Sequence, residues 1–135
     1  MATMHNLSLG AKGEKQVLVT EENAISFLGP EGARVLSTPH MIGHMEYTCR
    51  DLVLPLLEPG YDTVGAHVDV KHLAAAPMGA TVRFLAEIIH IADRRVRFRV
   101  EAWADGEKIG EGTHERGIIN VARFTAHQAE KLKKI

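Results

Sequence analysis

The stretch TPHMIGHMEYTCRDLVLPLL, residues 38–57, carries the strongest helix signal in the sequence. Thr38 suits the N-cap of a helix and Pro39 suits the first helical position. At about 100° per residue the apolar side chains gather on one face, with most polar side chains broadly opposite. The pattern predicts a long, mostly buried helix that Pro55 weakens near its end.

Beyond this helix the hydrophobic pattern changes to the period of strands. Apolar and polar residues alternate from Val64 to Lys71, from Val82 to His90 and from Val96 to Ala104. Asp105-Gly106 is a hairpin signal, after which a last strand is predicted from about Lys108 to Val121. Strands joined by tight turns predict an antiparallel meander.

The two ends of the chain carry weaker signals. Residues 1–10 look loose, Lys15 to Thr20 is a short β-rich segment, and a helix is predicted from Thr20 to about Pro30. Residues 124–135 predict a polar terminal helix. No repeat or linker divides the chain, so we expect one domain over all 135 residues.

The order of these elements predicts the fold class. One long apolar helix needs a concave sheet to bury it. We therefore expect an α+β fold in which a curved antiparallel sheet wraps a long central helix.

Composition excludes several classes of protein. The formal net charge is −1, which gives no basic excess for nucleic acid. Cys49 is the only cysteine, so no intrachain disulfide can form, as is typical of a reducing cytoplasm. The first ten residues lack a signal-peptide pattern, and no apolar run approaches the length of a membrane span. We expect a cytoplasmic protein with no membrane or nucleic-acid partner.

Three residues are candidates for chemistry. Thr38 begins the central helix, Glu46 lies two turns later near the edge of its apolar face, and His72 ends a strand before a run of small residues. A hydroxyl, a carboxylate and an imidazole can share acid–base work. Each also has an ordinary explanation, since Thr38 can cap the helix and the other two can be solvated. Spacing alone does not separate these alternatives.

Two further groups are weaker candidates. His40 and His44 are four residues apart on a helix, so both could bind one metal ion, but no third ligand has matching spacing. We therefore expect no metal. Arg95, Arg97 and Arg99 share one strand face that could touch phosphates, although such a face is more often simply solvated.

Four segments together resemble the fluoroacetyl-CoA thioesterase family of hotdog proteins. The resemblance runs from about Ser37 to Phe124. The segments are STPHMIGHMEYTC (37–49), LEPGYDTVG (57–65), VKHLAAAPMG (70–79) and GEGTHER (110–116).

This resemblance implies a hotdog fold and a set of site residues. The catalytic threonine, glutamate and histidine of the family fall on Thr38, Glu46 and His72. Its glycine beside the acyl group falls on Gly65, and the arginine of its HER segment falls on Arg116. The fluoroacetyl-specific members carry phenylalanines in a lid before the threonine, whereas residues 29–36 here contain no aromatic side chain.

The resemblance implies hydrolysis of a small acyl-CoA thioester, with coenzyme A as part of the substrate and no other cofactor. It also implies a homodimer with the site between subunits. Three alternatives stay open: a non-catalytic acyl-CoA binder or sensor, a hydratase using Asp69 and His72, and a metal-dependent function through His40 and His44. The sequence does not decide which acyl group is hydrolysed, which pathway the protein serves, or whether it forms a dimer or a tetramer. It also does not decide between a covalent acyl-enzyme and direct attack by water.

Overall fold

A computed structural model describes residues 5–135 as one antiparallel sheet and two helices. The sheet order is β1-β3-β4-β5-β2, and every neighbouring pair is antiparallel, which confirms the predicted α+β architecture. The elements are β1 (Lys12–Leu18), α1 (Thr38–Val53), a 3₁₀ turn η1 (Leu54–Leu56), β2 (Tyr61–His72), β3 (Thr81–Ala92), β4 (Arg95–Ala104), β5 (Glu107–Asn120) and α2 (Val121–Leu132).

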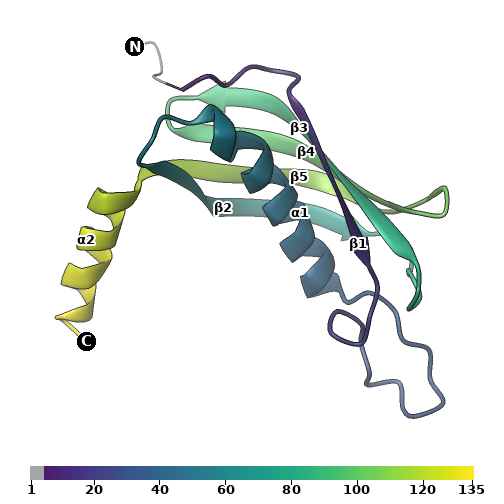
Figure 1. The fold of residues 1–135 in the computed structure, drawn as a ribbon. Helices are drawn as coiled ribbons and strands as arrows, with labels where there is room; N and C mark the ends of the chain where they lie inside the picture. The colour runs from purple at the N-terminus through teal and green to yellow at the C-terminus, as the bar shows by residue number, and fades with distance from the viewer. Residues whose placement is uncertain (1–4) are drawn as a thin grey trace.

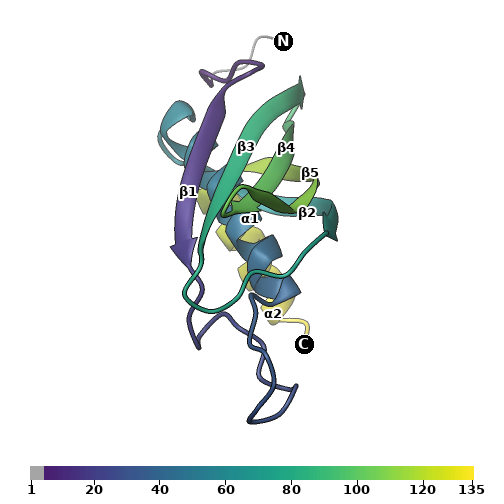
Figure 2. The ribbon, with the colours of Figure 1, turned by 90° about the vertical axis from the view of Figure 1, so that its right-hand side faces the viewer.

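The core lies between α1 and the face of the sheet that α1 crosses (Figures 1 and 2). Met41, Met45 and Cys49 on α1 are fully or almost fully buried, as are Phe84 and Phe98 on the central strands. The helix lies close to the sheet because β5 has little bulk there. A Cβ atom added to Gly110 would lie 2.6 Å from the Met41 sulfur.

The β2 strand differs from the pattern predicted for it. The alternation from residue 64 to 71 predicted one buried face, but residues 64–69 are exposed on both faces. Two features explain this. β2 is an edge strand, and its pairing with β5 shifts register between Gly65 and His67, which marks a β-bulge. This exposed edge is long enough to accept another strand.

The predicted helix from Thr20 to about Pro30 is wrong. Residues 21–23 form a turn and no helix follows. Side chains close this turn: the Thr20 amide donates to the Asn23 side chain at 2.9 Å, and the Asn23 side-chain amide donates to the Leu18 carbonyl at 3.0 Å. Such local bonds compete with a helix. Phe27 and Leu28 are exposed, so an apolar helix face would have had nothing to pack against.

The helix boundaries also need correction. Ser37, not Thr38, is the N-cap of α1, and its side chain accepts a hydrogen bond from the His40 amide. The helix ends at Val53, and the chain continues as a 3₁₀ turn containing Pro55, which confirms the predicted weakening. The last strand ends at residue 120 and α2 begins at once, three residues earlier than predicted.

The two ends of the chain are placed differently. Residues 1–4 of the predicted loose segment lie outside the described residues. The Asn6 and Gly10 amides donate hydrogen bonds to the Leu56 and Ile88 carbonyls. At the other end, α2 extends away from the sheet (Figure 1). Within residues 5–135, no helix is both long and apolar enough to cross a membrane.

Candidate active site

The structure brings Thr38 and His72 together. The Thr38 hydroxyl lies 2.7 Å from Nδ1 of His72, although the residues are 34 apart in the chain. Thr38 is the first residue of α1 and His72 the last residue of β2, so the end of a helix meets the end of a strand. The Thr38 hydroxyl is available for this contact because Ser37 supplies the helix cap.

His72 has the properties of a proton acceptor. Burial lowers the pKa of its imidazole below the ordinary value, and the nearby Ala74 carbonyl opposes this by raising it. The lowered pKa favours the neutral form of the ring. Its Nε2 is buried and has no hydrogen-bond partner among the described residues. A cleft of about 380 Å³ beside the pair is lined by Thr38, His72 and the exposed side chain of Phe27.

Glu46 belongs to a second group on a different part of α1. Its Oε2 lies against Gly65 of β2, where an added Cβ would approach to 2.6 Å. The carboxylate side chain is 38% exposed, and its other neighbours are the Arg116 guanidinium at 3.4 Å and the His114 ring at 4.0 Å. The absent side chain of Gly65 thus makes room for the carboxylate.

Arg116 is held rigidly beneath this carboxylate. Its Nε donates to the Thr63 hydroxyl at 2.7 Å and its Nη2 to the Thr63 carbonyl at 2.9 Å. The Nη1 group lies 3.2 Å from Nε2 of His114, whose Nδ1 lies 2.8 Å from the His67 carbonyl. Since a carbonyl can only accept, Nδ1 of His114 carries the proton and Nε2 accepts from Arg116. Burial and the Arg116 charge lower the pKa of His114, which favours this neutral form.

These two groups do not meet within one chain. No hydrogen bond or ion pair of residues 5–135 joins Thr38 or His72 to Glu46, Gly65 or Arg116. Eight residues of helix separate Thr38 from Glu46, a rise of about 12 Å. The chain therefore carries two separate groups at different positions along α1 and β2, a hydroxyl–imidazole pair and a carboxylate–guanidinium pair, which are called the two half-sites below.

Comparison with known proteins identifies the family of this chain. The family described as fluoroacetyl-CoA-specific thioesterase matches residues 19–122. A fluoroacetyl-CoA thioesterase from Streptantibioticus cattleyicolor is 34% identical over 131 residues, which cover 93% of this chain and 94% of that protein. The chain belongs to the fluoroacetyl-CoA-specific thioesterase family.

Solved structures support the family assignment and confirm the hotdog fold. The structure of the fluoroacetyl-CoA thioesterase FlK superposes with a TM-score of 0.84 at 34% identity, covering 93% of this chain and 97% of that one. A thioesterase superfamily member from Thermus thermophilus has the same TM-score at 35% identity, covering 94% and 93%. A hot-dog-like protein from Thermanaerovibrio acidaminovorans shares the fold at 19% identity, with a TM-score of 0.83 over 91% of each chain.

The other candidates from the sequence lie elsewhere. His40 bonds to Ser37 through Nδ1 at 2.6 Å, and His44 packs on the ring of Phe84 instead of lying opposite the core. Among residues 5–135, no three potential metal ligands of the His, Cys, Asp or Glu type cluster together. The arginine series on β4 faces outward and is paired with carboxylates of Glu87 and Glu115.

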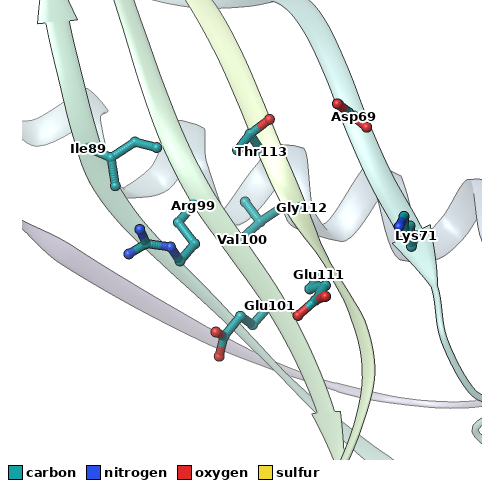
Figure 3. Close-up of a pocket in the computed structure, with 9 residues that line it drawn as sticks. All are labelled: Asp69, Lys71, Ile89, Arg99, Val100, Glu101, Glu111, Gly112 and Thr113. Carbon is teal, nitrogen blue, oxygen red and sulfur yellow. The ribbon is translucent and has the colours of Figure 1, made fainter.

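A pocket of about 350 Å³ on the outer face of the sheet does not contain these half-sites. Figure 3 shows its side chains on the strands, with α1 behind the sheet. Its charged groups are largely neutralised by their neighbours. Arg99 pairs with Glu87, and Lys108 bridges Glu101 and Glu111.

Sequence reasoning missed the residues that hold Arg116. Thr63 was not a candidate, and His114 was noted only as part of the HER segment, yet both are buried and both bind the Arg116 guanidinium. The available signal was strand parity, since His114 and Arg116 are two apart on β5 and so share the face toward α1. Phe27 was also not a candidate, because the sequence comparison with the family considered only residues 29–36.

Proposed function

We propose that this protein hydrolyses small acyl-CoA thioesters to a free acid and coenzyme A. The observation that carries the proposal is the 2.7 Å contact between the Thr38 hydroxyl and the neutral His72 imidazole, in a chain of the thioesterase family. A hydroxyl bonded to a neutral imidazole is the arrangement that nucleophilic and general-base catalysis require.

The proposed chemistry uses both half-sites. His72 takes the proton from water or from Thr38 as the new bond to the thioester carbonyl carbon forms, and then returns a proton to the departing thiolate. Attack by water gives the free acid directly. Attack by Thr38 gives a threonine ester, which water then hydrolyses as His72 takes the proton of the water and returns one to the Thr38 oxygen. Positioned general-base catalysis typically contributes about 10²–10⁴-fold. Glu46 orders the attacking group from the other side of the carbonyl. Gly65 and Arg116 adjoin Glu46 and line the place of the acyl group.

A thioester oxygen needs a hydrogen-bond donor as it gains negative charge. The first turn of α1 offers few free amides. Pro39 has no N–H, and the N–H groups of His40 and Met41 are bonded to Ser37. The Thr38 N–H is the amide of this turn that we propose for the oxyanion, with help from the helix dipole.

A homodimer brings the half-sites together. We propose that the exposed β2 edges of two copies pair antiparallel about a two-fold axis, so that the His72 end of one strand lies beside the Gly65 region of the other. Each site then takes its hydroxyl and imidazole from one subunit and its carboxylate from the partner. The buried, unpaired thiol of Cys49 fits a cytoplasmic location, and the proposed reaction needs no cofactor beyond the coenzyme A of the substrate.

Release of free thiol from a panel of acyl-CoAs tests the activity. Acetyl-, propionyl- and fluoroacetyl-CoA should all be included, and small acyl groups should be turned over. Binding of these thioesters without any thiol release would overturn the proposal in favour of an acyl-CoA binder.

Mixing of inactive subunits tests the shared site. His72→Ala and Glu46→Gln homodimers should each be inactive, whereas unfolding the two together and refolding them should restore activity. Random reassociation about a two-fold axis leaves about a quarter of the sites intact. Refolding each variant alone is the control. Absence of any recovery, with mixed dimers shown to be present, would place the whole site within one subunit.

A further inference from the structure

A cleft between α2 and the end of the sheet has an unusual charge. Its volume is about 450 Å³, and its lining includes Arg94, Arg123, His127 and Lys131 but no carboxylate side chain. The first of these precedes β4 and the other three lie on α2. One face of α2 therefore presents the cations of Arg123 and Lys131 to the cleft.

The two arginines of this cleft are exceptional within the chain. Neither Arg94 nor Arg123 has a carboxylate within 4 Å among the described residues. Every other arginine does: Arg34, Arg50, Arg83, Arg95, Arg97, Arg99 and Arg116. Guanidinium groups left without an acidic partner and placed on opposite walls of one cleft are suited to an anion supplied from outside.

The remaining lining suits a nucleotide better than a simple anion. Tyr61 and Phe124 line the same cleft and are half-buried, so each presents part of its ring to the cavity. Aromatic faces stack on nucleic-acid bases while cations contact the phosphates. The walls are also anchored, since the Val121 amide donates to the Gly60 carbonyl and the Ile118 amide to the Arg94 carbonyl.

We infer that this cleft binds the 3′-phosphoadenosine diphosphate end of the coenzyme A thioester. The inference rests on the proposed function, which supplies the substrate, and extends it by naming the site of the nucleotide. No residue of the cleft belongs to either half-site.

The length of the substrate decides which half-site the cleft serves. Tyr61 in the cleft and Gly65 are four residues apart on β2, about 13 Å at the rise of a strand. The pantetheine arm is a chain of about a dozen bonds and spans roughly 14 Å, by comparison with extended polypeptide. His72 of the same strand lies about 36 Å from Tyr61, which is too far. Figure 1 likewise shows α2 and the start of α1 at opposite ends of the sheet.

The nucleotide therefore lies on the subunit that supplies Glu46 and Gly65. The hydroxyl and imidazole that attack the same thioester come from the partner subunit. Each substrate molecule thus spans the interface, with its acyl end between subunits and its phosphates on one of them.

A double substitution, Arg94→Gln with Arg123→Gln, tests the assignment. The KM for acetyl-CoA should rise about tenfold with kcat unchanged, since these contacts are the same in the ground and transition states. Hydrolysis of acetyl-pantetheine, which lacks the phosphates and adenine, should not change. Arg83→Gln with Arg97→Gln is the matched control, because it removes the same charge from paired, exposed arginines elsewhere.

Two outcomes would overturn the inference. One is an equal rise in KM for acetyl-CoA in the test and control variants. The other is the same loss for acetyl-pantetheine as for acetyl-CoA.

Calorimetry of binding separates this inference from the proposed function. Coenzyme A should bind the wild-type protein about tenfold more tightly than the Arg94/Arg123 variant, and 3′,5′-ADP should compete with it. This result without any hydrolysis would refute the thioesterase and retain the nucleotide site. Normal hydrolysis by the wild-type protein, with the same coenzyme A affinity in the Arg94/Arg123 variant, would refute the nucleotide site and retain the thioesterase.

Discussion

The two half-sites hold their functional groups in opposite ways. Thr38 is exposed and has a single side-chain partner, His72, which in turn keeps one ring nitrogen without a partner among the described residues. Arg116 is buried and makes hydrogen bonds through all three of its nitrogens. In the proposed reaction the first pair exchanges protons with the substrate. The second is a fixed support that orients one carboxylate. Substitutions in the first should therefore change activity, and substitutions in the second should also change stability.

The largest expected effect is that of His72→Ala on turnover. Loss of the base should lower kcat for acetyl-CoA by about 10²–10⁴-fold, while the dimer persists. The free energy of unfolding should change little, because the ring is only half-buried and bonds to one side chain. Steady-state kinetics and light scattering measure the two properties. His90→Ala, which truncates an exposed imidazole on β3, is the control. Retained turnover in His72→Ala would remove this residue from the mechanism.

Arg116→Met should have a larger effect on stability than His72→Ala has. Removing a buried cation from beneath a partly exposed carboxylate should lower the free energy of unfolding by about 2 kcal/mol. Urea denaturation measures this change. Arg50→Met is the control, because it breaks a bidentate pair with Asp62 that is more exposed, and it should cost less than about 1 kcal/mol. Equal losses in the two variants would contradict the description of the second half-site as a rigid support.

Gly65→Ala probes the space reserved for the carboxylate. The new Cβ would lie 2.6 Å from Glu46 Oε2, so the flexible end of that side chain must move. We expect kcat to fall about tenfold, as expected for a displaced catalytic group, with a stability change below about 1 kcal/mol. Gly43→Ala is the control. An added Cβ at this helical position meets nothing within 4 Å, and the change should leave kcat intact. Unchanged kcat in Gly65→Ala would show that the position of Glu46 is not critical.

The pH dependence should report the depressed pKa of His72. A base acts in its neutral form, and burial keeps this imidazole neutral below its ordinary pKa of 6.5. The rise of kcat/KM with pH should therefore have its midpoint below pH 6.5. Circular dichroism in the same buffers should accompany the kinetics, because buried His114 also has a lowered pKa and its protonation in the unfolded chain reduces stability below that pH. A midpoint above 6.5 would argue against neutral His72 as the base.

The smallest effect should come from Phe27→Ala. This side chain lines the cleft beside Thr38 and His72 but is 79% exposed, so its removal should change the free energy of unfolding by less than about 0.5 kcal/mol. We expect a change in KM of about two- to threefold, because the ring supplies apolar surface near the thioester. Leu9→Ala, another exposed apolar side chain, is the control. A large loss of kcat would assign Phe27 a direct part in the reaction.

The sequence by itself determined the central helix, the antiparallel meander and the fold. Residues 38–53 form a helix because apolar side chains recur at its period, and β4 is buried on one face because its apolar residues alternate. The same sequence named Thr38, Glu46, His72, Gly65 and Arg116 through resemblance, whereas spacing alone left each of them with an ordinary explanation.

Tertiary structure decided which of these residues meet. Thr38 and His72 are neighbours only because the start of α1 and the end of β2 coincide in space, and local spacing carries no record of such long-range contacts. The exposed β2 edge, the turn at residues 20–23 and the helix cap at Ser37 were likewise settled by competition between local hydrogen bonds and burial. That competition depends on what each segment packs against, which only the folded chain defines.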